Sequence, residues 1–286
     1  MSQNNFKLIE CPRDAMQGLH NFIPTELKVE YLNLLLQVGF DTLDFGSFVS
    51  TKAIPQMADT AEVLAKLDLS NTNTKLLAIV ANLRGVEDAI KHEAVDYLGF
   101  PFSISETFQQ RNTNSSIMQS LNTVEEMLSL CAKKNKKAVI YLSMGFGNPY
   151  GDEWNYGIVE QWADVLVGKG AEILSLADTV GVSTPEKIEN ILPELISKFK
   201  NTEIGIHLHS TPADRFEKIE AAYRSGVTRI DSALKGFGGC PMAADDLTGN
   251  IATEDVISYL NSKEEILNLN MDKWKEAIAF SGKIFG

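Results

Sequence analysis

Two histidines, His207 and His209, close the apolar run IGIHLH. In a β-strand, side chains two positions apart point to the same face, so both imidazoles are expected to project together. The sequence contains only four histidines, and imidazole is a common metal ligand. This stretch alone is consistent with a metal site at a strand end or with two ordinary buried or exposed histidines.

Other side chains capable of chemistry also follow short apolar runs. They are Arg13 and Asp14, Asp44, Asp178, and, after the glycine-rich stretch GFGG, Cys240 with Asn250 further along. Two imidazoles with oxygen ligands suit Mg²⁺, Mn²⁺ or a similar divalent cation. Such a cation can polarise the oxygens of a substrate as a Lewis acid.

Each of these residues also has a purely structural explanation. Aspartates such as Asp14 and Asp178 are favoured in loops and caps. Arg13 could be a surface charge, and Asp44 could pair with a neighbouring strand. A lone cysteine such as Cys240 is more often a small buried hydrophobe. These explanations would have to hold at every strand end at once, which favours a functional site.

Eight short β-like runs must position these residues, and amphipathic stretches separate them. The predicted strands are 6–10, 42–45, 75–80, 96–100, 137–142, 173–176, 203–207 and 229–232. Several are almost continuously apolar, as expected of strands buried on both faces. The predicted helices include 26–38 and 114–132. The stretch 183–186 (STPE) predicts a helix start with a capping box, and Gly39, Gly170 and Gly226 predict left-handed helix ends.

Eight strand-helix units favour a (β/α)8 TIM barrel, an α/β fold, over an open doubly wound sheet. The open sheet usually has a G-x-G-x-x-G turn after its first strand, whereas this chain has ECPRDAMQG. We predict one TIM-barrel domain over 1–286, with the barrel at about 6–235 and an active-site loop and extra C-terminal helices at about 236–286. Barrels build their sites at the C-terminal strand ends.

Composition limits the partners of the chain. The net charge of -12 argues against binding nucleic acid, and no apolar run approaches the roughly 18 residues of a membrane span. Cys11, Cys131 and Cys240 are far apart and form no CxxC pair, which fits a reducing compartment. The first ten residues resemble neither a signal nor a transit peptide. We therefore expect a cytoplasmic protein without nucleic-acid or membrane partners.

Seven motifs are spread along the chain. They are PRDAMQ (12–17), GSFVSTKAIPQMAD (46–59), RNTNSSI (111–117), ADTVGVSTP (177–185), HLHS (207–210), GFGGCP (236–241) and GNIATED (249–255). Together, and in this order, they resemble the 3-hydroxy-3-methylglutaryl-CoA lyase family, within the metal-dependent lyase and Claisen-condensation barrels.

The resemblance implies a divalent metal, usually Mg²⁺ or Mn²⁺, and no organic cofactor. The implied ligands are Asp14, His207, His209 and Asn250. The implied reaction is the retro-Claisen cleavage of 3-hydroxy-3-methylglutaryl-CoA to acetyl-CoA and acetoacetate, in leucine or ketone-body-type metabolism. Family members commonly pair, so a homodimer is expected.

The resemblance also implies catalytic roles. Arg13 would stabilise the enolate of the acetyl fragment, and Cys240 would donate a proton to it, because a thiol is mostly protonated at neutral pH. His207 or another group beside the metal would take the proton of the substrate hydroxyl, and Asp44 would complete the catalytic set. The expected substrate contacts are Gln17, Ser47 and Asp178.

Four features differ from the usual family pattern. Asp44 replaces a glutamate, Gly18–His20 replace asparagine, glutamate and lysine, and Pro212 replaces an aromatic residue. The loop between Cys240 and Asn250 is one residue longer and carries Asp245 and Asp246. The metal ligands are unaffected, but a second hypothesis stays open: a related lyase, aldolase or synthase for another 3-hydroxyacyl-CoA or an oxo acid. The third hypothesis is a catalytically silent binding barrel.

Overall fold

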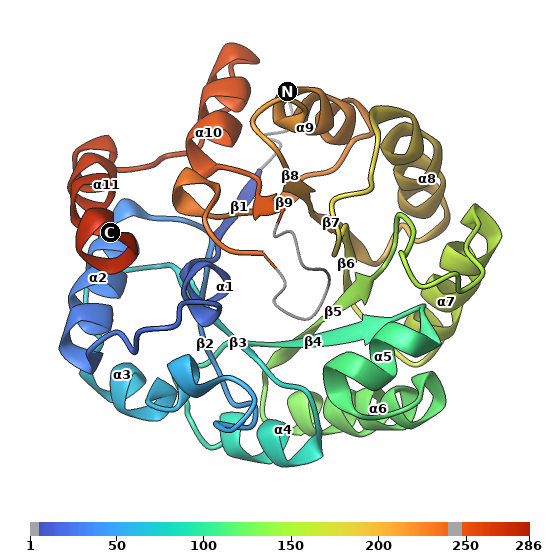
Figure 1. The fold of residues 1–286 in the computed structure, drawn as a ribbon, viewed down its shortest axis with the longest axis horizontal. Coiled ribbons are helices and arrows are strands. Elements are labelled where there is room, and N and C mark those ends of the chain that lie inside the picture. Colours follow the sequence, from blue (N-terminus) through green and yellow to red (C-terminus); the bar gives the residue numbers. More distant parts are fainter. Residues whose placement is uncertain (1–5, 240–247) are drawn as a thin grey trace.

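Eight parallel strands close into a barrel (Figure 1), so the predicted TIM-barrel fold is confirmed. The computed structural model describes residues 6–239 and 248–286. The barrel strands, in spatial order, are β1 (Lys7–Glu10), β2 (Thr42–Ser47), β3 (Lys75–Ile79), β4 (Tyr97–Ser103), β5 (Lys137–Ser143), β6 (Ile173–Ala177), β7 (Glu203–His207) and β9 (Arg229–Ser232). The barrel closes where β1 pairs in parallel with β9, with Lys7 opposite Arg229.

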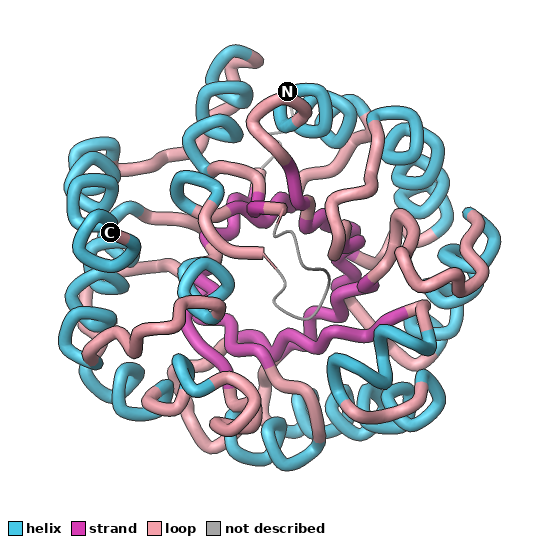
Figure 2. The backbone as a smooth tube through the Cα atoms, viewed as in Figure 1, coloured by secondary structure: helices cyan, strands magenta, loops and turns pink. Residues whose placement is uncertain are grey.

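Helices surround the barrel on all sides (Figure 2). They are α1 (Pro12–Gln17), α2 (Thr25–Val38), α3 (Thr60–Lys66), α4 (Leu83–Ala89), α5 (Glu106–Thr113), α6 (Ile117–Lys133), α7 (Tyr156–Gly168), α8 (Pro185–Lys198), α9 (Arg215–Arg224), α10 (Thr253–Ser262) and α11 (Met271–Phe285), with two 3-10 turns, η1 (Pro55–Met57) and η2 (Leu234–Gly236). Within the described ranges, no helix is both long enough and apolar enough to cross a membrane.

The helix ends follow the local sequence. Gly39, Gly170 and Gly226 all have positive φ, as predicted for left-handed helix ends. At the start of α8, the Thr184 side chain caps the helix by accepting a hydrogen bond from the Lys187 N–H. The predicted capping box was wrong at this position, because Thr184 is the N-cap and the third helical residue is therefore Lys187.

The extra C-terminal helical segment is also confirmed, since α11 lies against α2 outside the barrel (Figure 1). The Asn270 N–H donates to the Val38 carbonyl at 2.8 Å, which ties the start of α11 to the end of α2. Trp274 packs edge-on against Phe40, with 5.6 Å between ring centroids. These contacts bury an apolar face of α11 that would otherwise be exposed to water.

A short antiparallel ribbon lies beyond the barrel strands and was not predicted. It pairs β8 (His209–Ser210) with β10 (Gly249–Asn250). Asn250 lies directly opposite His209 in this ribbon. The ribbon therefore brings two residues from distant parts of the chain to the same end of the barrel.

Candidate active site

A cavity of about 400 Å³ opens at the C-terminal ends of the barrel strands. Its lining includes the predicted site residues Arg13, Asp14, Gln17, Ser47, His207 and His209. The first three lie on α1, which begins one residue after β1, and the histidines lie at the end of β7 and on β8. The position agrees with the general placement of sites in TIM barrels.

Asp14, His207 and His209 form a compact group of potential metal ligands. One ligand atom from each lies within 4.8 Å of the others. The Nδ1 atom of His207 lies 3.2 Å from Asp231 Oδ2, and the Nδ1 atom of His209 lies 3.1 Å from the Thr179 carbonyl oxygen. Each ring therefore has its Nε2 atom left to bind a metal, an arrangement typical of histidine ligands.

Two buried polar atoms, one in this group and one next to it, support a metal at the site because they lack hydrogen-bond partners among the described residues. The two atoms are His209 Nε2 and Asn250 Oδ1. The Asn250 Nδ2 atom donates to Asp14 Oδ2 at 2.7 Å and to the Phe237 carbonyl at 2.8 Å, which fixes the orientation of the amide. Buried polar atoms are rarely left unpaired. A divalent cation would take up the lone pairs of both atoms, so the residues present fit such a cation.

Arg13 lies between two carboxylates. Its Nε atom donates to Asp44 at 3.0 and 3.2 Å, and its Nη2 atom also contacts Asp44. Its Nη1 atom donates to Asp14 at 2.8 Å, and the Gln17 amide donates to the same Asp14 oxygen. The guanidinium is therefore fixed in a planar, two-sided arrangement next to the potential metal ligands.

The environment sets the charges of these groups. Burial would raise the pKa of Asp14, but Arg13 and the two histidines outweigh it and hold that pKa at about 2. Burial lowers the pKa of His209 to about 4. Burial also opposes a proton on His207, yet the hydrogen bond and charge of Asp231 raise the pKa of His207. At neutral pH, Asp14 is thus ionised and His209 neutral, the forms that bind metals.

The other predicted site residues differ in where they lie. Ser47 lines the cavity, and its buried hydroxyl has no partner among the described residues. Asp44 is fully buried and does not line the cavity; burial raises the pKa of Asp44 to about 6 despite Arg13. Cys240, Asp245 and Asp246 lie outside the described residues.

Asp178 occupies a different place from the substrate contact that was expected. It is 1% exposed and is not among the residues that line the cavity. Its carboxylate accepts hydrogen bonds from the Val182 N–H at 2.8 Å and from the hydroxyl and N–H of Ser183. The loop after β6 is folded around this carboxylate, which holds the loop in place.

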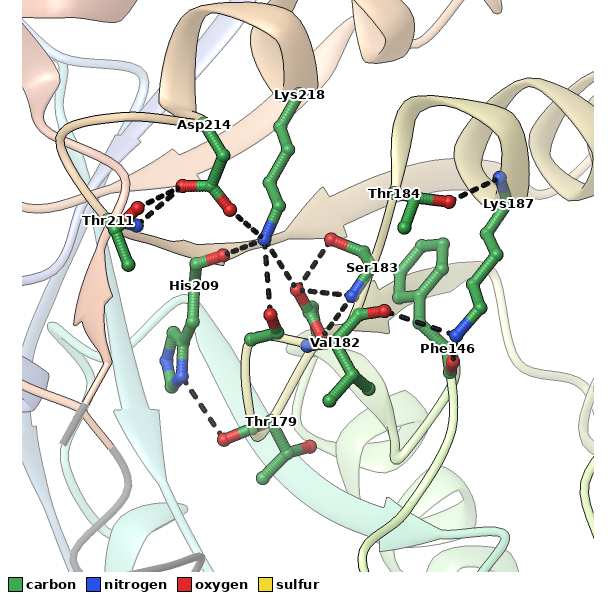
Figure 3. A network of polar contacts seen from close by, with 12 residues as sticks. Phe146, Thr179, Val182, Ser183, Thr184, Lys187, His209, Thr211, Asp214 and Lys218 are labelled. Atoms are coloured by element: carbon green, nitrogen blue, oxygen red, sulfur yellow. Dashed lines mark hydrogen bonds and ion pairs between the residues drawn. The ribbon is translucent and has the colours of Figure 1, made fainter. Parts of the chain in front are cut away.

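Sequence reasoning missed the residues that support the histidines. Asp231 lies in a predicted strand, two residues from Arg229, and no local signal distinguishes it from an ordinary buried aspartate. Lys218, on α9, contacts the carbonyl oxygen of His209 (Figure 3). The period of α9 indicates which helix face is buried, but not which backbone atom a lysine on that face reaches.

The chain matches the HMGL-like family model over residues 6–280. The cytoplasmic 3-hydroxy-3-methylglutaryl-CoA lyase of Rattus norvegicus is 33% identical over 272 residues, which are 95% of this chain and 78% of the relative. Hydroxymethylglutaryl-CoA lyase YngG of Bacillus subtilis is 32% identical, over 92% of this chain and 87% of the relative.

Solved structures agree with these relatives. The HMG-CoA lyase of Bacillus subtilis superposes with a TM-score of 0.91 at 30% identity, covering 98% of this chain and 94% of that one. An HMG-CoA lyase from Acinetobacter baumannii, in complex with coenzyme A and 3-methylmalate, has a TM-score of 0.90 at 26% identity, covering 99% and 92%.

The fold and the site together define a TIM-barrel enzyme whose mouth is suited to a divalent metal. With the relatives considered, its class is that of the carbon-carbon lyases. The chain belongs to the HMGL-like family, which contains the hydroxymethylglutaryl-CoA lyases.

Proposed function

We propose that the protein cleaves 3-hydroxy-3-methylglutaryl-CoA to acetyl-CoA and acetoacetate, with a divalent metal and without an organic cofactor. The observation that carries the proposal is the group formed by Asp14, His207 and His209 next to the fixed guanidinium of Arg13. The names of the relatives supply the substrate. The complex of the Acinetobacter enzyme supports an acyl-CoA ligand in this kind of cavity.

The residues that would hold the metal are Asp14, His207, His209 and Asn250, and Mg²⁺ or Mn²⁺ fits their oxygen and imidazole donors best. When bound, the metal supplies Lewis acidity toward the hydroxyl and carbonyl oxygens of the substrate. The protein's own residues then have three tasks. They have to remove one proton from the hydroxyl, stabilise one negative charge on the thioester and donate one proton to the new methyl group.

Arg13 is suited to the negative charge. When the carbon-carbon bond breaks, its electron pair passes to the acetyl thioester as an enolate. A guanidinium already fixed by Asp44 and Asp14 needs no reorganisation to stabilise that charge. In this proposal Asp44 is a positioning residue for Arg13, since it contacts the guanidinium and does not line the cavity.

The two protons have separate carriers. Because His207 Nδ1 faces Asp231, the ring offers only its Nε2 atom to the cavity. That nitrogen cannot bind a metal and accept a proton at once, so with His207 as a ligand the hydroxyl proton passes to water in the cavity, while Asp14, whose pKa is about 2, stays ionised. Cys240 remains the proposed donor to the enolate carbon, and its thiolate regains a proton from water.

The cavity offers contacts for the rest of an acyl-CoA. The proposed substrate contacts are Gln17 and Ser47, which line the cavity; the buried Ser47 hydroxyl has no partner among the described residues. Arg111, an exposed residue of α5, also lines the cavity and stacks on Tyr150, with 4.6 Å from its guanidinium carbon to the ring centroid. We propose that Arg111 contacts the phosphates of coenzyme A, since a guanidinium matches phosphate geometry.

The test is acetoacetate release from 3-hydroxy-3-methylglutaryl-CoA by the purified protein, with Mn²⁺ or Mg²⁺ and with a chelator. We expect release that the chelator abolishes and that His209→Ala removes. Other 3-hydroxyacyl-CoA thioesters should be cleaved at least tenfold more slowly. Equal turnover of several thioesters would instead favour a broader lyase, and Mn²⁺ binding without any cleavage would refute the proposed reaction.

A cytoplasmic location, a homodimer and a role in leucine degradation complete the proposal. The isolated cysteines support a reducing compartment, and curated relatives include both cytoplasmic and mitochondrial lyases. Sedimentation of the purified chain tests the dimer, and fractionation of the source cells tests the compartment.

A further inference from the structure

A buried ammonium group lies behind the proposed metal ligand His209. Lys218 reaches from α9 into the interior and is 1% exposed. Its Nζ atom donates to the His209 carbonyl at 2.8 Å and lies 3.0 Å from Asp214 and 3.4 Å from Asp178 (Figure 3). A further contact of 3.4 Å reaches the Gly181 carbonyl. A buried cation with these partners is unlike the exposed lysines of a solvated helix face.

These contacts join two parts of the structure that fix the position of the His209 side chain. The first is the backbone at residue 209, whose carbonyl oxygen Lys218 contacts directly. The second is the loop after β6, where the Thr179 carbonyl lies 3.1 Å from Nδ1 of the His209 ring. Lys218 reaches that loop through Asp178 and Gly181. The backbone of the ligand and the loop that orients its ring are thus connected through a single nitrogen atom.

We propose that Lys218 is a positioning residue for metal binding, which holds His209 so that its Nε2 atom points at the metal. The inference rests on the metal site of the proposed function, but not on its substrate. Asp178 and Asp214 balance the charge of Lys218, so the ammonium does not leave a net positive charge behind a cation site. Groups that orient metal ligands from behind typically contribute about 10- to 100-fold to metal affinity.

The chain offers a matched control in Lys187, on α8. Its Nζ atom donates to the Val182 carbonyl of the same loop at 3.1 Å and to the Phe146 carbonyl at 2.8 Å (Figure 3). None of the hydrogen bonds described for Lys187 involves His209. Lys187 therefore tethers the loop without contacting the ligand, which separates a general effect on the loop from the effect proposed here.

The experiment is titration of the metal-free protein with Mn²⁺, followed by the electron paramagnetic resonance signal of the free ion. We expect Lys218→Met to raise the Kd for Mn²⁺ by about tenfold or more, and Lys187→Met to leave it within about twofold. Lys218→Gln keeps an uncharged NH2 donor group at the end of a shorter chain, so its Kd should fall between those of the wild type and Lys218→Met. Circular dichroism establishes that each titrated variant is folded, and Lys218→Gln is the test variant if Lys218→Met does not fold.

The outcomes are distinct. An unchanged Kd in the folded Lys218 variant, or an equal loss in Lys187→Met, would overturn the inference. Absence of Mn²⁺ binding by the wild-type protein would also overturn it. Wild-type Mn²⁺ binding without cleavage of the thioester would refute the proposed reaction only, and the comparison of the two lysine variants would still stand.

Discussion

Among single residues, Arg13 is the one whose charge and orientation are fixed most clearly by its contacts. Asp44 holds one edge of its guanidinium and Asp14 holds the other. Burial disfavours its charge, but these two carboxylates outweigh burial and raise the pKa of Arg13 further above its already high value. The group is therefore a permanent positive charge with a fixed plane. A lysine would keep the charge but could not reproduce the two-edged contact.

We predict that Arg13→Lys lowers kcat for thioester cleavage by about 100- to 1,000-fold, the range found when a preorganised charge-stabilising donor is lost. The Kd for Mn²⁺ should change little, because a positive charge still lies beside Asp14. Steady-state kinetics and an Mn²⁺ titration measure the two quantities. A variant with wild-type kcat would show that the enolate charge is stabilised elsewhere.

The meeting of several candidate site residues at one cavity could be predicted from the sequence, but some of their contacts could not. Arg13, Asp14, His207 and His209 meet at the cavity as expected. Asp44 lies beside a register shift in the pairing of β2 with β3, between Asp44 and Gly46. An irregularity of this kind redirects side chains, and alternation along a strand cannot reveal it.

At the level of elements, the ribbon of β8 and β10 and the glycines beside it shape the site. Gly238 has a φ of +93°, and a Cβ atom there would lie 2.7 Å from the Asp14 carbonyl oxygen and 2.8 Å from Asn250 Nδ2. The backbone of Gly238 thus packs directly against two proposed metal ligands. No side chain fits at this position without moving at least one of them.

We therefore predict that Gly238→Ala weakens Mn²⁺ binding by about tenfold or more, because ligands displaced from their supports bind metal poorly. Gly18→Ala is the matched control: Gly18 also lies close to α1, but nothing lies within 4 Å of a Cβ built there. Mn²⁺ titration of both variants gives the comparison. Equal Mn²⁺ affinities of the two variants would mean that the backbone around residue 238 shifts to accommodate the methyl group without moving Asp14 or Asn250.

A second element contact connects β1 with the chain that follows β9. Glu10 is fully buried and accepts hydrogen bonds from the Leu234 N–H at 2.8 Å and the Thr253 hydroxyl at 2.6 Å. It thereby ties the starts of η2 and α10 to the barrel. Burial raises the pKa of Glu10 from 4.5 to about 8, despite these two hydrogen bonds.

This raised pKa predicts a specific dependence of stability on pH. Between pH 4.5 and about 8, the folded protein keeps a proton on Glu10 that the unfolded chain releases. The contribution of Glu10 to the free energy of unfolding therefore falls as pH rises, by about 1.4 kcal/mol per pH unit at most. Glu10→Gln removes this titration. The free energy of unfolding of the variant, measured with denaturant, should therefore rise relative to that of the wild type from pH 5 to about pH 8. A constant difference would contradict the prediction.

The regular elements were easier to predict than the connections between them. The eight predicted strands lie within three residues of the observed ones at each end, because strands buried on two sides are almost continuously apolar. The ribbon of β8 and β10 was missed, since strands of two residues have no period to detect. The place of Asp178 was missed because its contacts depend on the fold of the loop that brings Val182 and Ser183 back to its carboxylate.

For the whole molecule, the proposed metal ligands come from both ends of the barrel's sequence. Asp14 follows the first strand, His207 ends β7, and Asn250 follows the last barrel strand. A cation at the site would therefore connect the segments that close the barrel. Because an unfolded chain holds these residues far apart, binding favours the folded state strongly.

We predict that Mn²⁺ at 100 times its Kd stabilises the protein by about 2.7 kcal/mol, which raises the Tm of a domain of this size by several degrees. Scanning calorimetry with and without Mn²⁺ measures the shift. His209→Ala, which removes one ligand, should lose most of it. A shift that persists in this variant would place the stabilising ion elsewhere.

The pairing of β1 with β9 also has a consequence for synthesis of the protein on the ribosome. The edge of β1 that pairs with Arg229–Ser232 has no partner until all eight barrel strands have been translated. Until then the nascent chain carries an open sheet edge, a known hazard for aggregation. The last proposed ligand, Asn250, emerges later still, so the proposed metal site can be completed only after the last barrel strand has been translated.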